Sequence, residues 1–279
     1  MPSLKQINSR TKTVKQISKI TKAMQMVSAS RMKKAQDVAN SSIPYSAKLY
    51  QMMHRLKISL TDELPTNGQK MARQNRNLIL YFSTQKGLVG GLNSNVRRIL
   101  LASPLKENAD YIAIGKKGAR QLSGIKANVV LKFDLPKAGN LEEFLEVISK
   151  EVASLYGNGT YSKIYLLFPK FITTSKQIPE FLQLIPLGNT VNKTVNSGYE
   201  SYLFEPKPEV LYKELVANYL EIEILNAIYS TEASEQSARM VAMKNATDNA
   251  IDLAGKLTHI YNVKRQQKIT TEILELSNK

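Results

Sequence analysis

The last quarter of the chain carries a sustained heptad repeat. Between residues 215 and 261, apolar or small residues recur at spacings that alternate between four and three, over seven heptads. The first track is Leu215, Ile222, Tyr229, Gln236, Met243, Ala250 and Leu257, and the second is Tyr219, Asn226, Ala233, Met240, Thr247, Ala254 and Tyr261. This spacing places both tracks on one helical face and predicts a left-handed coiled coil with a partner helix.

The first sixty residues repeat with the same period. One track is Ile7, Val14, Thr21, Ser28, Ala35, Leu49 and Leu56, and the interleaved track is Ile17, Met24, Val38, Tyr45 and Met52. Both periodic segments are far longer than the roughly 20 residues of an ordinary globular helix. We therefore expect the two ends of the chain to pair as an antiparallel coiled coil rather than as two bundle helices.

Proline and glycine divide the chain into four parts. A first helix is expected from about Ser3 to about Leu60, with a bend at Pro44, because proline removes a backbone hydrogen bond and clashes with the preceding turn. The last helix follows Pro206 and Pro208 and is interrupted by no further proline. The predicted parts are a coiled-coil helix at 1–60, a linker at 61–76, an α/β domain at 77–205 and a coiled-coil helix at 206–279.

The central part has a different periodicity. Short apolar runs rich in β-branched and aromatic residues alternate with helical stretches, which predicts a Rossmann-like α/β domain with a mostly parallel sheet. Strands are expected at 78–82, 111–114, 129–133 and 164–168, with two more at 181–185 and 199–204. Helices are expected at 92–103, 116–123 and 140–156.

The net charge of +16 lies mainly in the first helix. Residues 1–36 contain nine lysines and arginines and no acidic residue, and Lys12, Lys15, Lys19 and Lys22 share one face of the helix. Four interpretations compete: a mitochondrial targeting peptide, a nucleic-acid stripe, a helix lying on a membrane surface, and the outer face of a rod that meets acidic proteins. The heptads continue past Asp37 and have a partner segment, which favours the last.

Candidate chemistry is sparse. The chain has no cysteine and only two histidines, so no metal site and no cofactor are expected. Gly87, Gly90 and Gly91 lie between a predicted strand and a predicted helix, where glycine-rich loops can bind phosphate. Their spacing matches neither common nucleotide-binding pattern. We favour a tight crossover in which Asn93 or Ser94 caps the helix, and we identify no active site.

Two long blocks closely resemble the γ subunit of F-type rotary ATP synthases. They are residues 234–250, SEQSARMVAMKNATDNA, and residues 20–36, ITKAMQMVSASRMKKAQ. The loop GLVGGLN at 87–93 and the segment 261–272 are also similar to that family. The resemblance follows chain order and is loose in the central domain outside the glycine loop.

The resemblance implies a non-catalytic rotor shaft that couples ion flow to ATP synthesis or hydrolysis. The coiled coil would enter a sleeve of three α and three β subunits, with its C-terminal tip deepest. The α/β domain would face the ε subunit and the c-subunit ring, on the cytoplasmic side of a bacterial cell membrane. Membrane contact would occur only through the complex, and nucleotide chemistry would belong to the β subunits.

Residues expected to contact the sleeve follow from the matching positions. Met24 and Arg239 match residues that face β near the neck of the shaft, where Arg31, Lys33 and Lys34 would meet an acidic segment of β. The same set includes Met240, Thr271 and Glu272. Thr271 departs from the family, which usually has glutamine there. Two alternatives stay open: a γ-like shaft of a specialised ATPase without a c ring, and a basic coiled-coil protein that binds nucleic acid.

Overall fold

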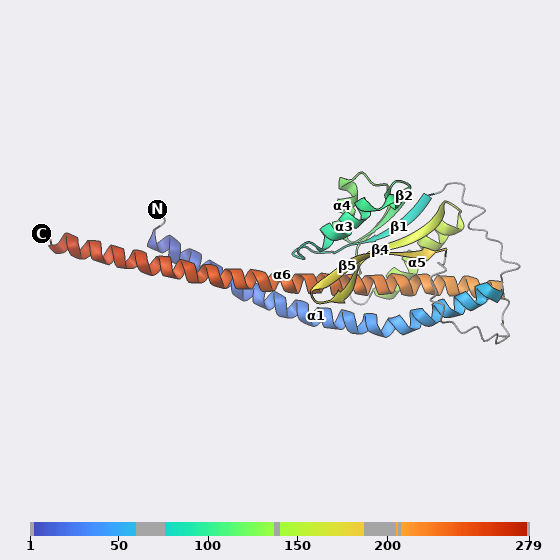
Figure 1. The fold of residues 1–279 in the computed structure, drawn as a ribbon, viewed down its shortest axis with the longest axis horizontal. Coiled ribbons are helices and arrows are strands. Elements are labelled where there is room, and N and C mark those ends of the chain that lie inside the picture. Colours follow the sequence, from blue (N-terminus) through green and yellow to red (C-terminus); the bar gives the residue numbers. More distant parts are fainter. Residues whose placement is uncertain (1–2, 60–75, 137–139, 187–204, 206–207, 278–279) are drawn as a thin grey trace.

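Two long helices dominate the structure. The computed structural model describes the chain except for residues 1–2, 60–75, 137–139, 187–204, 206–207 and 278–279. Helix α1 (Leu4–Ser59) and helix α6 (Pro208–Ser277) lie along each other (Figure 1), and we call this pair the shaft. Helix α1 is curved but continues without a break through Pro44. The predicted pairing of the two terminal helices is confirmed.

The pairing is antiparallel, and side-chain contacts give its register. The hydroxyls of Thr21 and Thr247 lie 2.7 Å apart, and Ser42 donates to Asn226. A step from 21 to 42 along α1 thus matches an equal step back from 247 to 226 along α6. The same register places Leu4 opposite Lys264, so residues 265–277 of α6 extend beyond the start of α1 (Figure 1).

The structure confirms the predicted α6 seam and corrects the α1 seam. Both α6 tracks are buried or half-buried. In α1 only the first track faces α6; of the second, Met24 is half-buried, whereas Ile17, Val38, Tyr45 and Met52 are between 39% and 54% exposed. The second track that faces α6 lies one residue later in each heptad and is buried at Thr11, Ser46 and Met53. Several residues of the buried track carry hydroxyl groups, so the prediction selected the more apolar neighbour in each heptad. Because one residue turns a helix by about 100°, this choice placed the second track on the wrong face.

The central domain contains a five-stranded sheet in the order β3-β2-β1-β4-β5. The strands are β1 (Arg76–Phe82), β2 (Ala109–Ile114), β3 (Val129–Phe133), β4 (Tyr161–Thr173) and β5 (Lys176–Ile185). Only β5 is antiparallel to its neighbour. Five predicted strands are therefore confirmed, and the one expected at 199–204 lies outside the described residues.

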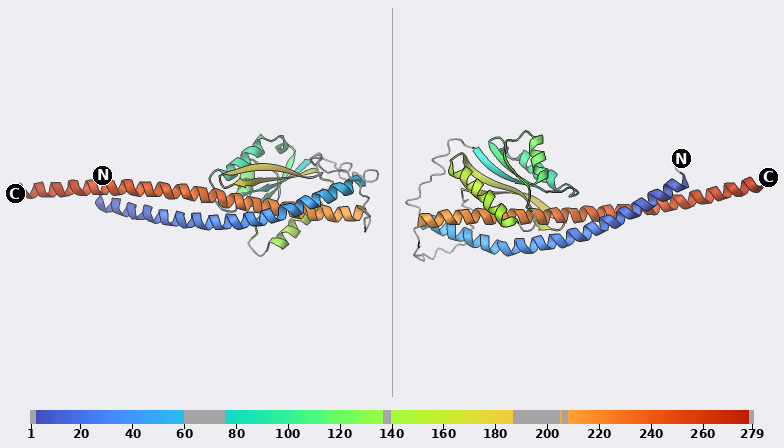
Figure 2. Two further views of the ribbon diagram at one scale, coloured as in Figure 1. Left: turned by 60° about the horizontal axis from the view of Figure 1, so that its bottom comes forward. Right: turned by 180° about the vertical axis from the view of Figure 1, so that it is seen from behind.

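Helices cover both faces of the sheet. Helix α3 (Leu92–Ala102) and helix α4 (Lys116–Gly124) pack on one face, around Ile79 and Tyr81 of β1. Helix α5 (Leu141–Gly157), helix α6 and the end of α1 pack on the other, around Leu78, Leu80 and Phe82. A short 3-10 turn, η1 (Pro104–Lys106), follows α3. Helix α6 is thus at once half of the shaft and a layer of the α/β domain, which lies at the end of the shaft away from the two termini (Figure 2).

Candidate functional site: the junction of the glycine loop and the shaft

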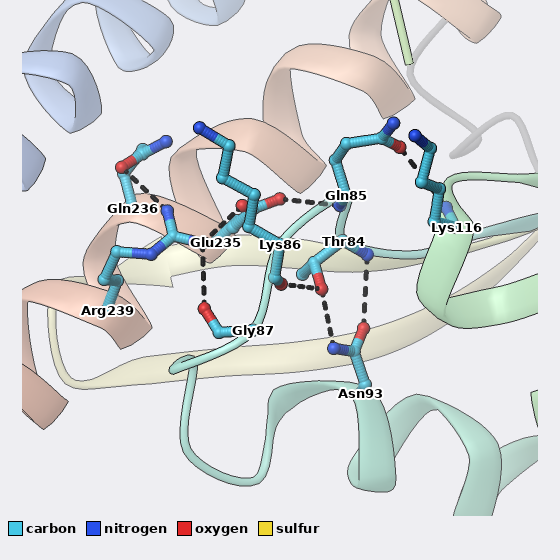
Figure 3. A network of polar contacts seen from close by, with 9 residues as sticks. All are labelled: Thr84, Gln85, Lys86, Gly87, Asn93, Lys116, Glu235, Gln236 and Arg239. Carbon is cyan, nitrogen blue, oxygen red and sulfur yellow. Dashed lines mark hydrogen bonds and ion pairs between the residues drawn. The ribbon is translucent and has the colours of Figure 1, made fainter. Parts of the chain in front are cut away.

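The glycine loop, residues 83–91, joins β1 to α3. Leu88 and Gly90 adopt left-handed backbone conformations, with φ of 62° and 55°. Helix α3 begins at Leu92 after an N-cap at Gly91 that makes no side-chain cap bond. The predicted cap by Asn93 or Ser94 is wrong, because both residues lie inside the first turn. The Asn93 amide instead accepts from the Thr84 N–H at 3.2 Å and donates to the Thr84 hydroxyl at 2.7 Å, which ties α3 to the loop (Figure 3).

The same loop closes the start of α4. The amide N–H groups of Lys116, Lys117 and Gly118 donate to the Gln85 side chain, the Thr84 carbonyl and the Ser83 hydroxyl, and that of the N-cap Gly115 donates to the Phe133 carbonyl of β3. These are the four N–H groups that a helix leaves without an internal partner. These N–H groups already have acceptors within the chain, so they are not free to bind a phosphate at the start of α4.

Two glycines make that close approach possible. Gly115 has a φ of 99°, and a Cβ atom there would lie 2.4 Å from the Ser83 carbonyl oxygen. A Cβ atom on Gly118 would lie 2.6 Å from the Ser83 hydroxyl oxygen. A side chain at Gly115 would require the backbone of Ser83 to move, and one at Gly118 would require the buried side chains of Ser83 and Tyr81 to move. The Gly115–Gly118 turn is thus required for α4 to dock on the end of β1.

Helix α6 binds the glycine loop through a buried ion pair. The Arg239 guanidinium donates to the Glu235 carboxylate at 2.5 Å and to the Gly87 carbonyl at 3.2 Å, and the other Glu235 oxygen accepts from the Gln85 N–H at 3.3 Å (Figure 3). Both side chains of the pair are only 8% exposed. Arg239 also donates to the Gln236 amide oxygen at 3.1 Å. Each charge is therefore paired and bonded to further groups, as a buried charge requires.

Three serines on α6 bind the hairpin formed by β4 and β5. Ser234 donates to the Pro169 carbonyl at 2.9 Å, Ser237 donates to the Thr174 carbonyl at 2.6 Å, and Ser230 accepts from the Phe171 N–H at 3.0 Å. Positions 230, 234 and 237 share one helical face. The far end of β4 is thus fixed to the same stretch of α6 that holds the glycine loop.

These contacts occupy the edge of the sheet where α/β domains usually bind ligands. The strand order reverses between β1 and β4, and doubly wound sheets place ligands outside the carboxyl ends of the strands at that point. Here residues 230–239 of α6 cover both strand ends. The chain's own helix fills the position that a nucleotide takes in other proteins of this architecture.

No other site chemistry emerges from the described residues. Within them, no group of three or more histidine, cysteine, aspartate or glutamate side chains is placed to hold a metal ion. Nor does any helix in the described part of the chain combine the length and hydropathy needed to cross a bilayer.

Two carboxyl groups of α6 beside the junction are perturbed. Burial raises the pKa of Glu223 to about 6, and the nearby Glu180 adds to this, while a hydrogen bond with Ser46 and the charge of Lys170 oppose it. Burial and the adjacent Glu235 also raise the pKa of Glu232, against the opposing charge of Arg31. Both groups sit between α6 and its neighbours, so desolvation dominates over the cations.

The residues predicted to meet a partner lie in three separate places. Arg31, Lys33 and Lys34 are exposed on α1. Thr271 and Glu272 are exposed where α6 extends beyond α1, with Glu272 paired to Lys268 at 3.4 Å. Met24 and Met240 are half-buried in the shaft.

Arg239 differs from the other predicted contacts because it is buried inside the chain. A contact between Arg239 and a partner requires its side chain to leave the bonds to Glu235 and Gly87. Sequence reasoning missed Glu235 and the three serines. The opposite charges four residues apart and the hydroxyls at 230, 234 and 237 were the available signals.

Comparison with known proteins gives a consistent result over the whole chain. A family model described as ATP synthase matches residues 3–278. The ATP synthase gamma chain of Azoarcus sp. (strain BH72) is 37% identical over 285 residues, covering 99% of this chain and 98% of the relative. That of Blochmanniella floridana is 32% identical over 287 residues, with the same coverage.

Solved structures show the same fold. The rotor of the Euglena gracilis mitochondrial ATP synthase matches with a TM-score of 0.64 at 16% identity, over 95% of this chain and 98% of that one. A chain of the central stalk and c-ring structure of the Tetrahymena thermophila mitochondrial ATP synthase matches with a TM-score of 0.63 at 23% identity, over 81% of this chain and 99% of that one.

Proposed function

The chain belongs to the family of ATP synthase gamma chains, and we propose that it is the non-catalytic central rotor shaft of an F-type ATP synthase. The observation that carries this function is the antiparallel pairing of α1 with α6, which makes a rod that rises from an α/β domain at one end. Helix α6 has 70 residues, a length of about 105 Å. Such a rod can transmit rotation between two distant parts of a complex.

The absence of catalysis in this chain is part of the proposal. It is supported by the filled ligand position, where Glu235 and Arg239 occupy the polar groups of the glycine loop. ATP would be made or hydrolysed on the β subunits. The shaft would bias each β subunit toward a different nucleotide affinity, because an asymmetric rod presents a different face to each of three sites.

We assign the part of the shaft beyond the domain to a sleeve of three α and three β subunits. The extension of α6 past α1 exposes Ile269, Ile273 and Leu274, which would lie deepest in the sleeve together with Thr271 and Glu272. Single exposed apolar residues are ordinary, but a row of them along a protruding helix is typical of a buried contact in an assembly.

We assign the exposed cations Arg31, Lys33 and Lys34, together with the half-buried Met24 and Met240 of the shaft, to the contact with β at the neck of the shaft. The attraction between such exposed cations and an acidic partner segment acts over about 8 Å in physiological salt. It favours no single pairing. A contact of that kind suits surfaces that turn past each other.

The α/β domain is left to meet the rest of the rotor. We propose that it contacts the ε subunit and the ring of c subunits, which would hold the chain peripherally on the cytoplasmic side of a bacterial cell membrane. Family membership favours this function over a basic coiled-coil protein that binds nucleic acid.

Reconstitution with α and β subunits tests the proposal. The chain has no cysteine, so a single cysteine in place of the exposed Glu107 gives a unique site for a probe on the α/β domain. ATPase activity is expected to depend on this chain, and the probe is expected to rotate in one direction during hydrolysis. Equal ATPase activity with and without the chain, or a probe that does not rotate, would refute the proposal. Adding membranes that contain c rings then distinguishes a coupled synthase from a shaft without a ring.

A further inference from the structure

We infer that Glu235 and Arg239 form the joint that fixes the angle of the α/β domain on the shaft, so that torque passes between them. This inference rests on the proposed rotor function. A rotor with its domain at one end needs a connection that resists twisting about the shaft axis. The buried pair and the glycine loop have the geometry for such a connection.

Apolar packing alone does not define that angle. The sheet packs on α6 through residues such as Ile224, Ala227 and Ile228, all at most 5% exposed. Apolar burial opposes separation but has no preferred direction. Hydrogen bonds depend steeply on angle and distance. Close packing limits rotation as well, and the polar contacts add a resistance that depends on direction.

The pair meets the loop with a defined polarity. Glu235 presents an acceptor to the N–H of Gln85, and Arg239 presents a donor to the C=O of Gly87. The two loop groups are backbone atoms, so they cannot turn away as side chains do. An ordered acceptor and donor on α6 thus match an ordered donor and acceptor on the loop in only one alignment.

The joint also reaches the seam of the shaft. Arg239 donates to Gln236, which lies on the confirmed α6 seam facing α1 and is 6% exposed. The contacts of the joint therefore continue from the glycine loop through Arg239 to a buried side chain of the α6 seam. The serine contacts of the hairpin provide a second attachment on the same stretch of α6, where Ser234 adjoins Glu235 and Ser237 lies between Glu235 and Arg239.

Exchanging the two residues tests this joint directly. The double variant Glu235→Arg with Arg239→Glu keeps the composition, the net charge and an ion pair four residues apart. It places a donor against the Gln85 N–H and an acceptor against the Gly87 carbonyl. The matched control is the double variant Glu146→Lys with Lys150→Glu, which reverses an exposed ion pair of the same spacing on α5.

Hydrogen exchange on the free chain gives the first measurement. In the exchanged variant, amides 85–91 are expected to exchange about tenfold faster than in the wild type, because local opening governs exchange. The exchange rate of amides around Thr247, far along the shaft, should equal that of the wild type. The control variant should match the wild type at all of these amides. Wild-type exchange at 85–91 in the exchanged variant would overturn the inference.

Rotation gives the second measurement. With the probe at position 107 of the reconstituted complex, the angular spread within each pause is expected to widen about twofold in the exchanged variant and to stay unchanged in the control. If the exchanged chain does not assemble, Arg239→Lys replaces it. That variant keeps the charge but cannot bond Glu235, Gln236 and Gly87 together. Its angular spread is expected to widen less than that of the exchanged variant, and its amides 85–91 are expected to exchange faster than in the wild type. An unchanged spread refutes the joint.

Different results refute the proposed function and the joint. A wild-type chain that does not support rotation refutes the proposed function. A wild-type chain that rotates, alongside an exchanged or Arg239→Lys variant that behaves identically, refutes only the joint.

Discussion

The two halves of the shaft are built from the same two helices but are packed differently. We call the part beside the α/β domain, up to Arg239 of α6, the domain half, and the part from there to the two termini the free half. In the half beside the α/β domain, Leu215, Tyr219 and Ile224 of α6 join Leu49 and Met53 of α1 in one core with the sheet. In the free half most buried positions are hydroxyls and small residues, such as Thr21, Ser28, Thr247, Ala250 and Ala254, and Ile7 and Met243 are the large apolar exceptions. None of these residues belongs to the core around the sheet.

The distribution of apolar side chains is inverted in the free half. Ile20 and Ile251, with exposed fractions of 60% and 57%, face outward, while the Thr21 and Thr247 hydroxyls face each other inside. Small residues let two helices approach closely, but they bury little apolar area. The domain half therefore supplies most of the stability of the chain. The free half leaves large apolar side chains exposed on its outer surface.

A cavity in the domain half should have the largest effect. Ile224→Ala removes a fully buried side chain between α6 and the sheet, and a loss of about 2–5 kcal/mol in the free energy of unfolding is expected. Urea unfolding of the free chain measures it. The matched control, Ile251→Ala in the free half, should change that free energy by no more than about 0.5 kcal/mol. Equal losses for the two variants would contradict the comparison.

Glu223 should give the domain half its own pH dependence. Its folded pKa, about 6, lies above the ordinary 4.5, so folding favours the protonated form. Between these two values the unfolded chain loses its proton first, and stability falls as the pH rises. One pKa unit is worth about 1.4 kcal/mol, which gives a loss of about 2 kcal/mol above pH 6.

Glu223→Gln should remove that loss. At pH 8 the variant is expected to be more stable than the wild type by up to about 2 kcal/mol, with a flatter dependence between pH 4.5 and 6, because the amide carries no charge to desolvate. Urea unfolding across this pH range measures the difference. Glu214→Gln, at an exposed position of the same helix, is the control. A control that reproduces the effect would assign it to net charge and not to burial.

The free half should respond weakly to changes in its seam. Thr21→Val and Thr247→Val each remove one hydroxyl of the buried pair, with an expected cost of about 1 kcal/mol. The double variant should cost less than the sum, because no hydroxyl is left facing an apolar group. A double-mutant cycle by thermal or urea unfolding measures the coupling. Strict additivity would show that the 2.7 Å contact contributes nothing.

Glycine should give the smallest effect, with opposite signs in the two regions. Gly255 lies in the free half of α6, and a Cβ atom there meets nothing within 4 Å. Gly255→Ala is therefore expected to stabilise the chain by about 0.5–1 kcal/mol through helix propensity. Gly118→Ala in the domain should destabilise it, because its Cβ would clash with Ser83 and Tyr81. Thermal unfolding distinguishes the two signs, and a stabilising Gly118→Ala would contradict the packing described for α4.

The elements of the fold followed from periodicity, but two details of their packing did not. Strands and helices have different repeats, so both long helices and five strands were placed correctly. The second α1 track failed because a seam that uses Thr11 and Ser46 gives no apolar signal, while Tyr45 and Met52, one residue earlier in each heptad, do. Asn93 failed as a cap because the helix start depends on the backbone conformation of Gly90 and Gly91, which composition does not reveal.

The junction was only half visible in the sequence. The glycine loop could be recognised from its spacing after a strand, and Arg239 from the family resemblance. That Arg239 faces inward depends on contacts between residues about 150 positions apart, which local patterns do not encode. The buried Glu235 makes the difference, because a carboxylate paired with Arg239 and with the Gln85 N–H can be desolvated at tolerable cost.

The double role of α6 restricts how this protein can be re-engineered. Helix α6 of the shaft covers one face of the sheet. An α/β domain excised without it would therefore expose Leu80, Phe82 and Leu166 to solvent. A chimaera that grafts the domain onto a foreign axle must carry residues 215–239 of α6 and the end of α1 with it. The fusion point between the donor and recipient sequences belongs after Arg239, where the two helices continue as a simple pair.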